Sequence, residues 1–125
     1  MHMHKILMYT CLMKQNYAFI KGSLNTILLK LLRENGRMYG YEITKMVREL
    51  SEGTMQLTEG ALYPALHKLE ADGLVVTTLE EVGNRKRKYY SLTPSGKKES
   101  GRKLKELAAF IEQMENILKL KLAQR

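Results

Sequence analysis

The 125-residue sequence has little cysteine, little proline and no long apolar run. Its one cysteine, Cys11, excludes an intrachain disulfide and indicates a reducing compartment, so we expect a cytoplasmic protein. Only two prolines and nine glycines interrupt the chain, which leaves most of it able to form regular structure. The apolar stretch at residues 6–13 is far shorter than the about 20 residues of a membrane-spanning helix. We therefore expect no membrane partner.

The residue sets that catalysis and metal binding require are also missing. His2 and His4 have no third ligand near them, so no metal site is expected. The sequence offers no plausible catalytic triad and no glycine-rich loop for a phosphate. We therefore expect neither an enzyme nor a cofactor.

What the chain has in excess is positive charge. Lys and Arg number 21 against 13 Asp and Glu, a formal net charge of +8. A small basic domain commonly has an acidic partner such as nucleic acid, although surplus charge also serves solubility alone. The length suits one domain with one core.

Apolar spacing predicts two helices in the first half of the chain. Residues 23–35 repeat apolar side chains at helical intervals behind Ser23, a suitable N-cap. A short link over residues 37–40 leads to a second helix at residues 41–50, with a predicted buried stripe of Ile43, Met46, Val47 and Leu50. Arg37, Lys45 and Arg48 are candidate phosphate contacts beside this helix.

A third helix is predicted to start after Thr58 and to end at Asp72-Gly73. Its core-facing residues are Leu62, Ala65, Leu66 and Leu69. Pro64 lies inside it and is expected to bend its N-terminal part, because proline removes one helical hydrogen bond.

The hydrophobic period then changes from 3.6 to 2. Residues 74–79 and 88–92 predict a hairpin with a charged tip and a turn at Gly83-Asn84. A last helix is predicted from Pro94, after the N-cap Thr93, to beyond Leu120. Its apolar stripe exceeds what one small core can cover, which predicts a homodimer, with a helix folded back on its own domain as the alternative. The predicted interface residues are Leu104, Leu107, Ala108, Ile111, Met114 and Leu118.

This order predicts a mainly α fold with a small β-hairpin: a winged helix-turn-helix followed by a long C-terminal dimerisation helix. The expected divisions are an N-terminal extension at residues 1–20, a DNA-binding domain at 21–93 and the dimerisation helix at 94–125. Met13 would make a natural start, so whether residues 1–12 belong to the protein stays open.

Three motifs resemble those of the PadR family of transcriptional regulators. They are YGYEI at residues 39–43, EGALYPALHKLE at 59–70 followed by DGL at 72–74, and RKRKYYSLTPSG at 85–96. The resemblance covers residues 22–118 and is closest to the short subfamily, which has a single dimerisation helix. Lys86 stands where the family often has proline. The resemblance implies a repressor that responds to a small aromatic or apolar effector.

In a helix-turn-helix the third helix enters the major groove by its N-terminal part. Residues 51–79 carry one basic side chain against four acidic ones, so the basic hairpin is the predicted electrostatic anchor. The predicted DNA-binding residues are Tyr41, Thr58, Glu59, Gly60, Tyr63, Pro64, His67, Lys68, Arg85, Lys86, Arg87 and Lys88.

The chemistry of these predicted residues suits particular contacts with DNA. Gly60 lets the backbone approach the duplex, and the amides at residues 58–61 suit a phosphate. Tyr63 offers a hydroxyl to a phosphate and a ring to a thymine methyl, unless Tyr63-Pro64 only shapes the helix. The four basic residues of the hairpin suit phosphates or the minor groove.

These observations predict a homodimer that binds a pseudo-palindromic operator in double-stranded DNA, and the resemblance implies that it acts as a repressor. Candidate residues for an effector cavity are Phe110, Met114, Tyr17 and Phe19, although a packed interface explains them equally well. The alternative function is a winged-helix module for protein association without specific DNA binding. A strong salt dependence of DNA affinity discriminates the two.

Overall fold

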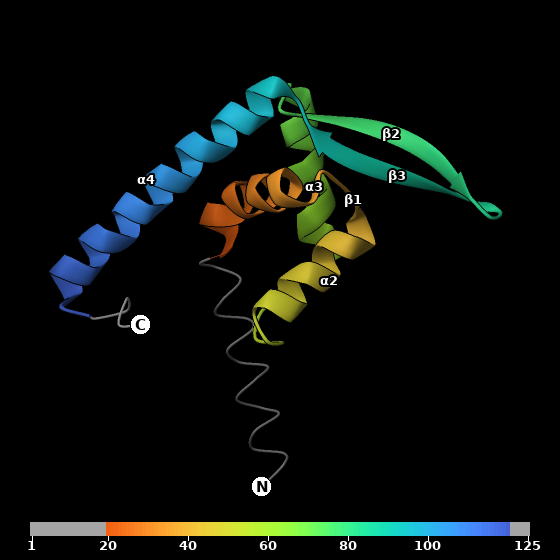
Figure 1. Ribbon diagram of the computed structural model, residues 1–125. Helices are drawn as coiled ribbons and strands as arrows, with labels where there is room; N and C mark the ends of the chain where they lie inside the picture. The colour runs from red at the N-terminus through yellow and green to blue at the C-terminus, as the bar shows by residue number, and fades with distance from the viewer. Residues whose placement is uncertain (1–19, 121–125) are drawn as a thin grey trace, which may run out of the picture.

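A computed structural model describes residues 20–120 (Figure 1). A first helix, red to orange in Figure 1, is described from residue 20 to residue 35. It is followed by β1 (Arg37–Tyr39), α2 (Gly40–Leu50), α3 (Glu59–Ala71), β2 (Val75–Val82), β3 (Arg85–Leu92) and α4 (Pro94–Leu118). This arrangement confirms the mainly α winged-helix plan with a long C-terminal helix.

The first helix supplies the largest share of the core. Leu28 and Leu29 are fully buried, and the stripe predicted for α3 is buried as well, apart from the half-buried Ala65. The prediction for α2 was wrong at Leu50, which is 72% exposed. Leu50 is the last residue of α2, and Leu57 from the following loop is buried in the core instead.

The three strands form an antiparallel sheet in the order β1-β3-β2. β1, which was predicted as a link, pairs only with residues 89–91 of β3. Three residues are too few to show a period of 2, so the partner strand reveals β1 and its own sequence does not. β2 and β3 pair over eight positions, from Val75 opposite Leu92 to Val82 opposite Arg85. The two-stranded part beyond β1, residues 79–88, is called the wing below.

α4 begins as predicted and ends earlier than predicted. The Thr93 side chain accepts a hydrogen bond from the Gly96 N–H at 3.0 Å, and Pro94 is the first helical residue. The helix ends at Leu118, because Lys119 takes a left-handed conformation with φ 56°. The Leu120 N–H then bonds the Glu115 carbonyl at 3.1 Å, which closes the helix end.

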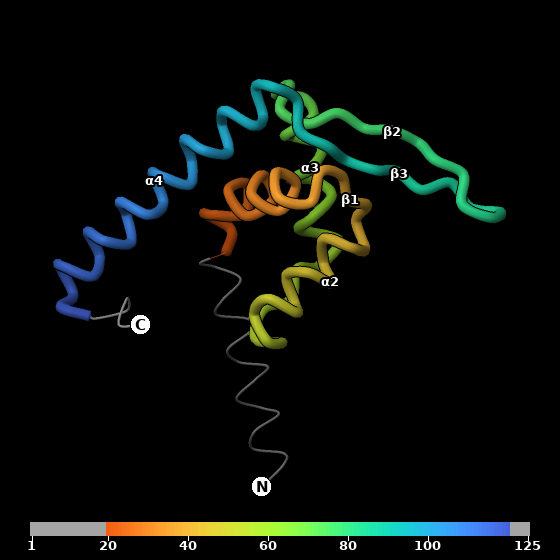
Figure 2. The backbone as a smooth tube through the Cα atoms, in the orientation of Figure 1, coloured from red at the N-terminus to blue at the C-terminus, as the bar shows by residue number. Residues whose placement is uncertain are grey.

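The start of α4 is fixed to the turn between α3 and β2. The Thr93 N–H bonds the Leu74 carbonyl at 3.0 Å, and the Thr93 hydroxyl donates to the Gly73 carbonyl at 2.7 Å. Gly96 lies so close to Leu74 that a Cβ there would be 3.0 Å from the Leu74 carbonyl carbon and still closer to its oxygen. Beyond this junction α4 and the wing leave the body on opposite sides (Figure 2). Within residues 20–120, no helix is both long and apolar enough to cross a membrane.

Candidate nucleic-acid interface

The surface of α3 away from the core is open to solvent at the predicted residues Glu59, Gly60, Pro64, His67 and Lys68. A Cβ added to Gly60 would meet only the Thr58 hydroxyl oxygen, 3.9 Å away. Thr58 caps the helix by accepting the Ala61 N–H at 3.3 Å. The prediction of free amides at residues 58–61 was therefore wrong at Ala61, whose N–H the cap uses. The first turn leaves the N–H groups of Glu59 and Gly60 outside the helical hydrogen bonds.

Tyr63 is half-buried, and its ring packs on the start of α2. A Cβ at Gly40 would lie 2.9 Å from Tyr63 Cζ and closer still to the hydroxyl oxygen. Residue 40 therefore has no room for a side chain, because the Tyr63 ring fills the space beside it. The sequence does not reveal this contact, because residues 40 and 63 lie on different helices.

A groove of about 640 Å³ lies between the wing and the helices. Its lining brings the predicted residues Tyr41 and Tyr63 next to the four basic residues of the wing, Arg85 to Lys88. The other predicted residues, at 58–60, 64, 67 and 68, do not line the groove and lie on exposed parts of the start and outer side of α3. The structure therefore places the basic wing beside the start of α2 and Tyr63 of α3.

Two acidic side chains around α3, Glu70 and Asp72, have partners within the domain. Lys68 Nζ lies 3.8 Å from Asp72 Oδ2, and the Thr77 hydroxyl donates to Glu70 Oε2 at 3.2 Å. The second bond joins α3 to β2. The wing by contrast carries its basic residues on both faces, since Lys86 and Lys88 alternate with Arg85 and Arg87 along β3.

Four side chains from β1 and β3 form a tyrosine–arginine cluster, defined here as Arg37, Tyr39, Arg87 and Tyr89. Arg37 Cζ lies 4.1 Å from the Tyr89 ring centroid, and Arg87 Cζ lies 4.5 Å from the Tyr39 centroid. The two rings meet edge to face at 5.4 Å. Hydrogen bonding to the Tyr89 side chain also raises the pKa of Arg87.

Arg37 was a candidate phosphate contact, and the structure shows it engaged within the sheet. Its Nη1 lies 2.5 Å from Glu80 Oε2 on β2, and this hydrogen bond lowers the pKa of Glu80 and raises that of Arg37. The pair links β1 to β2 across the central strand.

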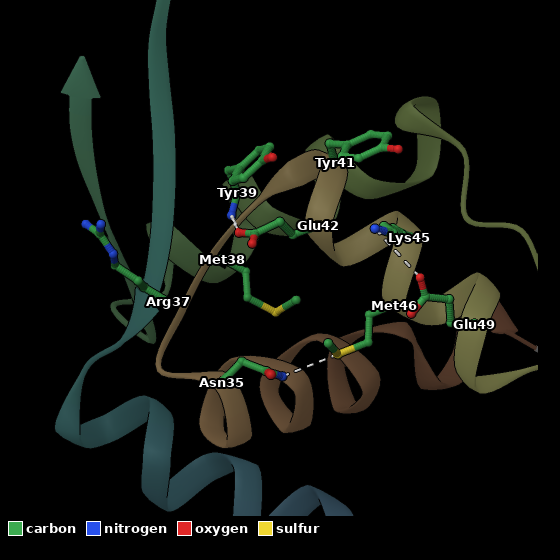
Figure 3. A pocket seen from close by; sticks show the side chains of 9 residues that line it. All are labelled: Asn35, Arg37, Met38, Tyr39, Tyr41, Glu42, Lys45, Met46 and Glu49. Carbon is green, nitrogen blue, oxygen red and sulfur yellow. Dashed lines mark hydrogen bonds and ion pairs between the residues drawn. The ribbon is translucent and has the colours of Figure 1, made fainter. Parts of the chain in front are cut away.

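β1 passes into α2 beside a hollow of about 370 Å³, which Figure 3 shows from close by. The Tyr39 N–H donates to Glu42 Oε1 at 3.1 Å, which fixes Tyr39 at the start of α2. Tyr39 and Tyr41 lie at the edge of the hollow, while Arg37 points away from it (Figure 3). Among residues 20–120, no three His, Cys, Asp or Glu side chains gather as a metal site.

Residues 28–102 match the family described as the PadR-like transcriptional regulators. This chain belongs to the PadR-like family. The three motifs on which the resemblance was based overlap the matched region, so that resemblance is confirmed.

Relatives with this PadR-like domain include regulators from several bacteria. The transcriptional regulator Rv3488 of Mycobacterium tuberculosis is 44% identical over 66 residues, which are 50% of this chain and 62% of that protein. A transcriptional regulator from Clostridium thermocellum has a TM-score of 0.73 at 32% identity, covering 79% of this chain and 93% of the other. A PadR family regulator from Clostridium difficile has a TM-score of 0.67 at 33% identity, covering 77% and 98%.

The C-terminal helix of this PadR-like chain exposes apolar side chains beyond its junction. Ile111 is 43% and Leu118 53% exposed, Leu104 and Ala108 are exposed, and Leu107 and Met114 are half-buried. A groove of about 560 Å³ separates α4 from the first helix, with Phe110 and Ile111 on one side and Gly22, Ser23 and Thr26 on the other. The candidate effector residues Tyr17 and Phe19 lie outside the described residues.

Proposed function

We propose that this PadR-like regulator is a homodimeric repressor that inserts α3 into the major groove of a specific operator and lays the wing on the neighbouring backbone. The observation that carries the proposal is the groove that brings four consecutive basic residues of the wing next to Tyr41 of α2 and Tyr63 of α3, while the outer side of α3 stays open to solvent. A duplex fits this arrangement, because a helix fills the major groove while cations bind the flanking phosphates.

The residues have separate tasks in the proposed complex. The N–H groups of Glu59 and Gly60 point from the helix start to a phosphate, and Gly60 allows the backbone to approach. The wing supplies affinity that does not depend on sequence, and the outer side of α3 supplies sequence preference. The proposed contacts are Tyr41, Thr58, Glu59, Gly60, Tyr63, Pro64, His67, Lys68, Arg85, Lys86 and Lys88. Arg87, which was also predicted as a contact, is half-buried and is left out of this set.

Dimerisation is proposed for α4, within residues 94–125. Its exposed apolar side chains, such as Phe110 and Ile117 at 56% and 71%, need cover that residues 20–120 of the same chain do not provide. Two-fold pairing would present two copies of α3, carried by residues 21–93, to a pseudo-palindromic operator.

Effector binding is proposed for the groove between the first helix and α4. Phe110 and Ile111 give this groove apolar surface that suits a small aromatic or apolar molecule. A molecule seated there would contact α4 and alter the pairing of the two protomers, which would release the operator.

The test compares wild-type protein with Gly60→Leu on duplex DNA selected in vitro from a random pool. Gly60→Leu adds bulk where backbone meets DNA, and the open space around Gly60 leaves the fold intact, so operator binding should be abolished. Ala71→Leu is the matched control, because Ala71 is exposed at the other end of the same helix. Circular dichroism and sizing should be the same for all three proteins.

A folded Gly60→Leu protein with wild-type operator affinity would remove α3 from the interface. Wild-type protein whose duplex affinity is insensitive to salt would favour the alternative, a protein-association module, since phosphate contacts release counterions.

A further inference from the structure

The wing needs support because it is a two-stranded ribbon. β1 pairs only with residues 89–91 of β3, so within the part of the chain that the structure describes no third strand lies beside residues 79–88. Isolated two-stranded ribbons are marginally stable and twist readily. A wing that binds phosphates at a fixed distance from α3 must therefore be held by side chains.

Arg87 differs from the other basic residues of the wing. It is half-buried, whereas Arg85, Lys86 and Lys88 are exposed. Its guanidinium lies over Tyr39 with Cζ 4.5 Å from the ring centroid, well inside the range of a cation–π contact.

Tyr39 connects this contact to the DNA-binding helices. Its ring stacks on Tyr41 of α2 at 6.4 Å and meets Tyr89 at 5.4 Å, while its backbone N–H is bonded by Glu42. The ring of Tyr63 from α3 packs against the next residue, Gly40. Tyr39 thus connects Arg87 to α2 through Tyr41, and the adjoining Gly40 connects α2 to Tyr63 of the proposed recognition helix.

We infer that Arg87 is a positioning residue: it holds the wing against α2 through Tyr39, while Arg85, Lys86 and Lys88 contact phosphates. The inference rests on the proposed DNA binding for its functional part. Its structural part, a wing whose order depends on Tyr39 and Arg87, stands without DNA.

The experiment uses Arg87→Gln, Tyr39→Leu, the double variant and the conservative Tyr39→Phe. Arg85→Gln is the matched control, because Arg85 lies on the same face of β3 and loses the same charge. The first measurement is ¹⁵N relaxation of the amides of residues 79–86 in the absence of DNA. Arg87→Gln and Tyr39→Leu should lower the order parameters of these amides, while Tyr39→Phe and Arg85→Gln should leave them unchanged.

The second measurement is the affinity for the selected operator as a function of salt. Arg85→Gln should flatten the slope of log K against log salt by about 0.9 per protomer, because it removes a phosphate contact. Arg87→Gln and Tyr39→Leu should each weaken operator binding about tenfold with the slope unchanged, and the double variant should be no weaker than either. Tyr39→Phe keeps the ring and should restore wild-type affinity.

Two results would overturn the inference. One is unchanged order in the wing of both Arg87→Gln and Tyr39→Leu. The other is a fall in the salt slope for Arg87→Gln equal to that for Arg85→Gln, with Tyr39→Leu binding normally, which would make Arg87 a phosphate ligand. Failure of wild-type protein to bind duplex DNA would instead refute the proposed function, and the relaxation data would still decide whether Arg87 positions the wing.

Discussion

Gly96→Ala should destabilise the protein, although the same change in most helices is favourable. Replacing glycine by alanine inside a helix ordinarily stabilises by about 0.5–1 kcal/mol. At Gly96 the new methyl group would overlap the Leu74 carbonyl, and it would also lie 3.2 Å from Leu92 Cδ2. The neighbouring atom is backbone, so α4 itself must move away.

Moving α4 breaks the two hydrogen bonds from Thr93 to Gly73 and Leu74, each worth about 1 kcal/mol net. Overpacking adds about 1 kcal/mol or more, so the loss should be about 2 kcal/mol after the helix gain is subtracted. Urea unfolding followed by circular dichroism at one fixed protein concentration measures it. Gly60→Ala is the control, and should be neutral or slightly stabilising because its Cβ has space. A Gly96→Ala protein as stable as wild type would show that α4 does not start against Leu74.

Two other predictions concern the dimer and acid stability. Ile111→Glu combined with Leu118→Glu should convert the proposed dimer to a folded monomer by light scattering, and a persistent dimer would place the interface elsewhere. Glu80 and Glu99 have pKa values below their ordinary 4.5, each because of an arginine partner, so their ion pairs stabilise the fold above that pH and stop doing so as pH falls through the lowered values. Glu80→Gln with Glu99→Gln should therefore be less stable than wild type near neutral pH and equal to it in strong acid. A difference that persists in strong acid would assign it to packing.

Local patterns in the sequence were enough to predict much of this fold. Thr58 and Thr93 predict the starts of their helices because an N-cap side chain accepts a hydrogen bond from an N–H only three residues later. Both of these hydrogen bonds are present. The α3 core stripe follows from helical period alone. Leu50 shows the limit, since helical period places it on the buried stripe and cannot show that Leu57 of the following loop is buried in the core instead.

Contacts between residues that lie far apart in the chain could not be predicted from the sequence. The approach of Arg87 to Tyr39 depends on the register of β3 with a three-residue strand that has no periodic signal. The packing of the Tyr63 ring against Gly40 joins two helices, and residue types alone do not predict it. The exposed face of α3 was predictable, while the contacts that fix the wing beside it were not.

The shortness of β1 also bears on solubility. Along residues 85–88, no strand within the described residues 20–120 pairs with β3 on its β1 side, and exposed Leu79 and Val82 lie on the facing strand β2. Such an open edge can recruit a strand from another copy and start aggregation. Four consecutive cationic side chains on that edge would repel the same segment of a second copy. Neutral substitutions in the wing therefore carry a risk of self-association, and charge there is constrained even in the absence of DNA.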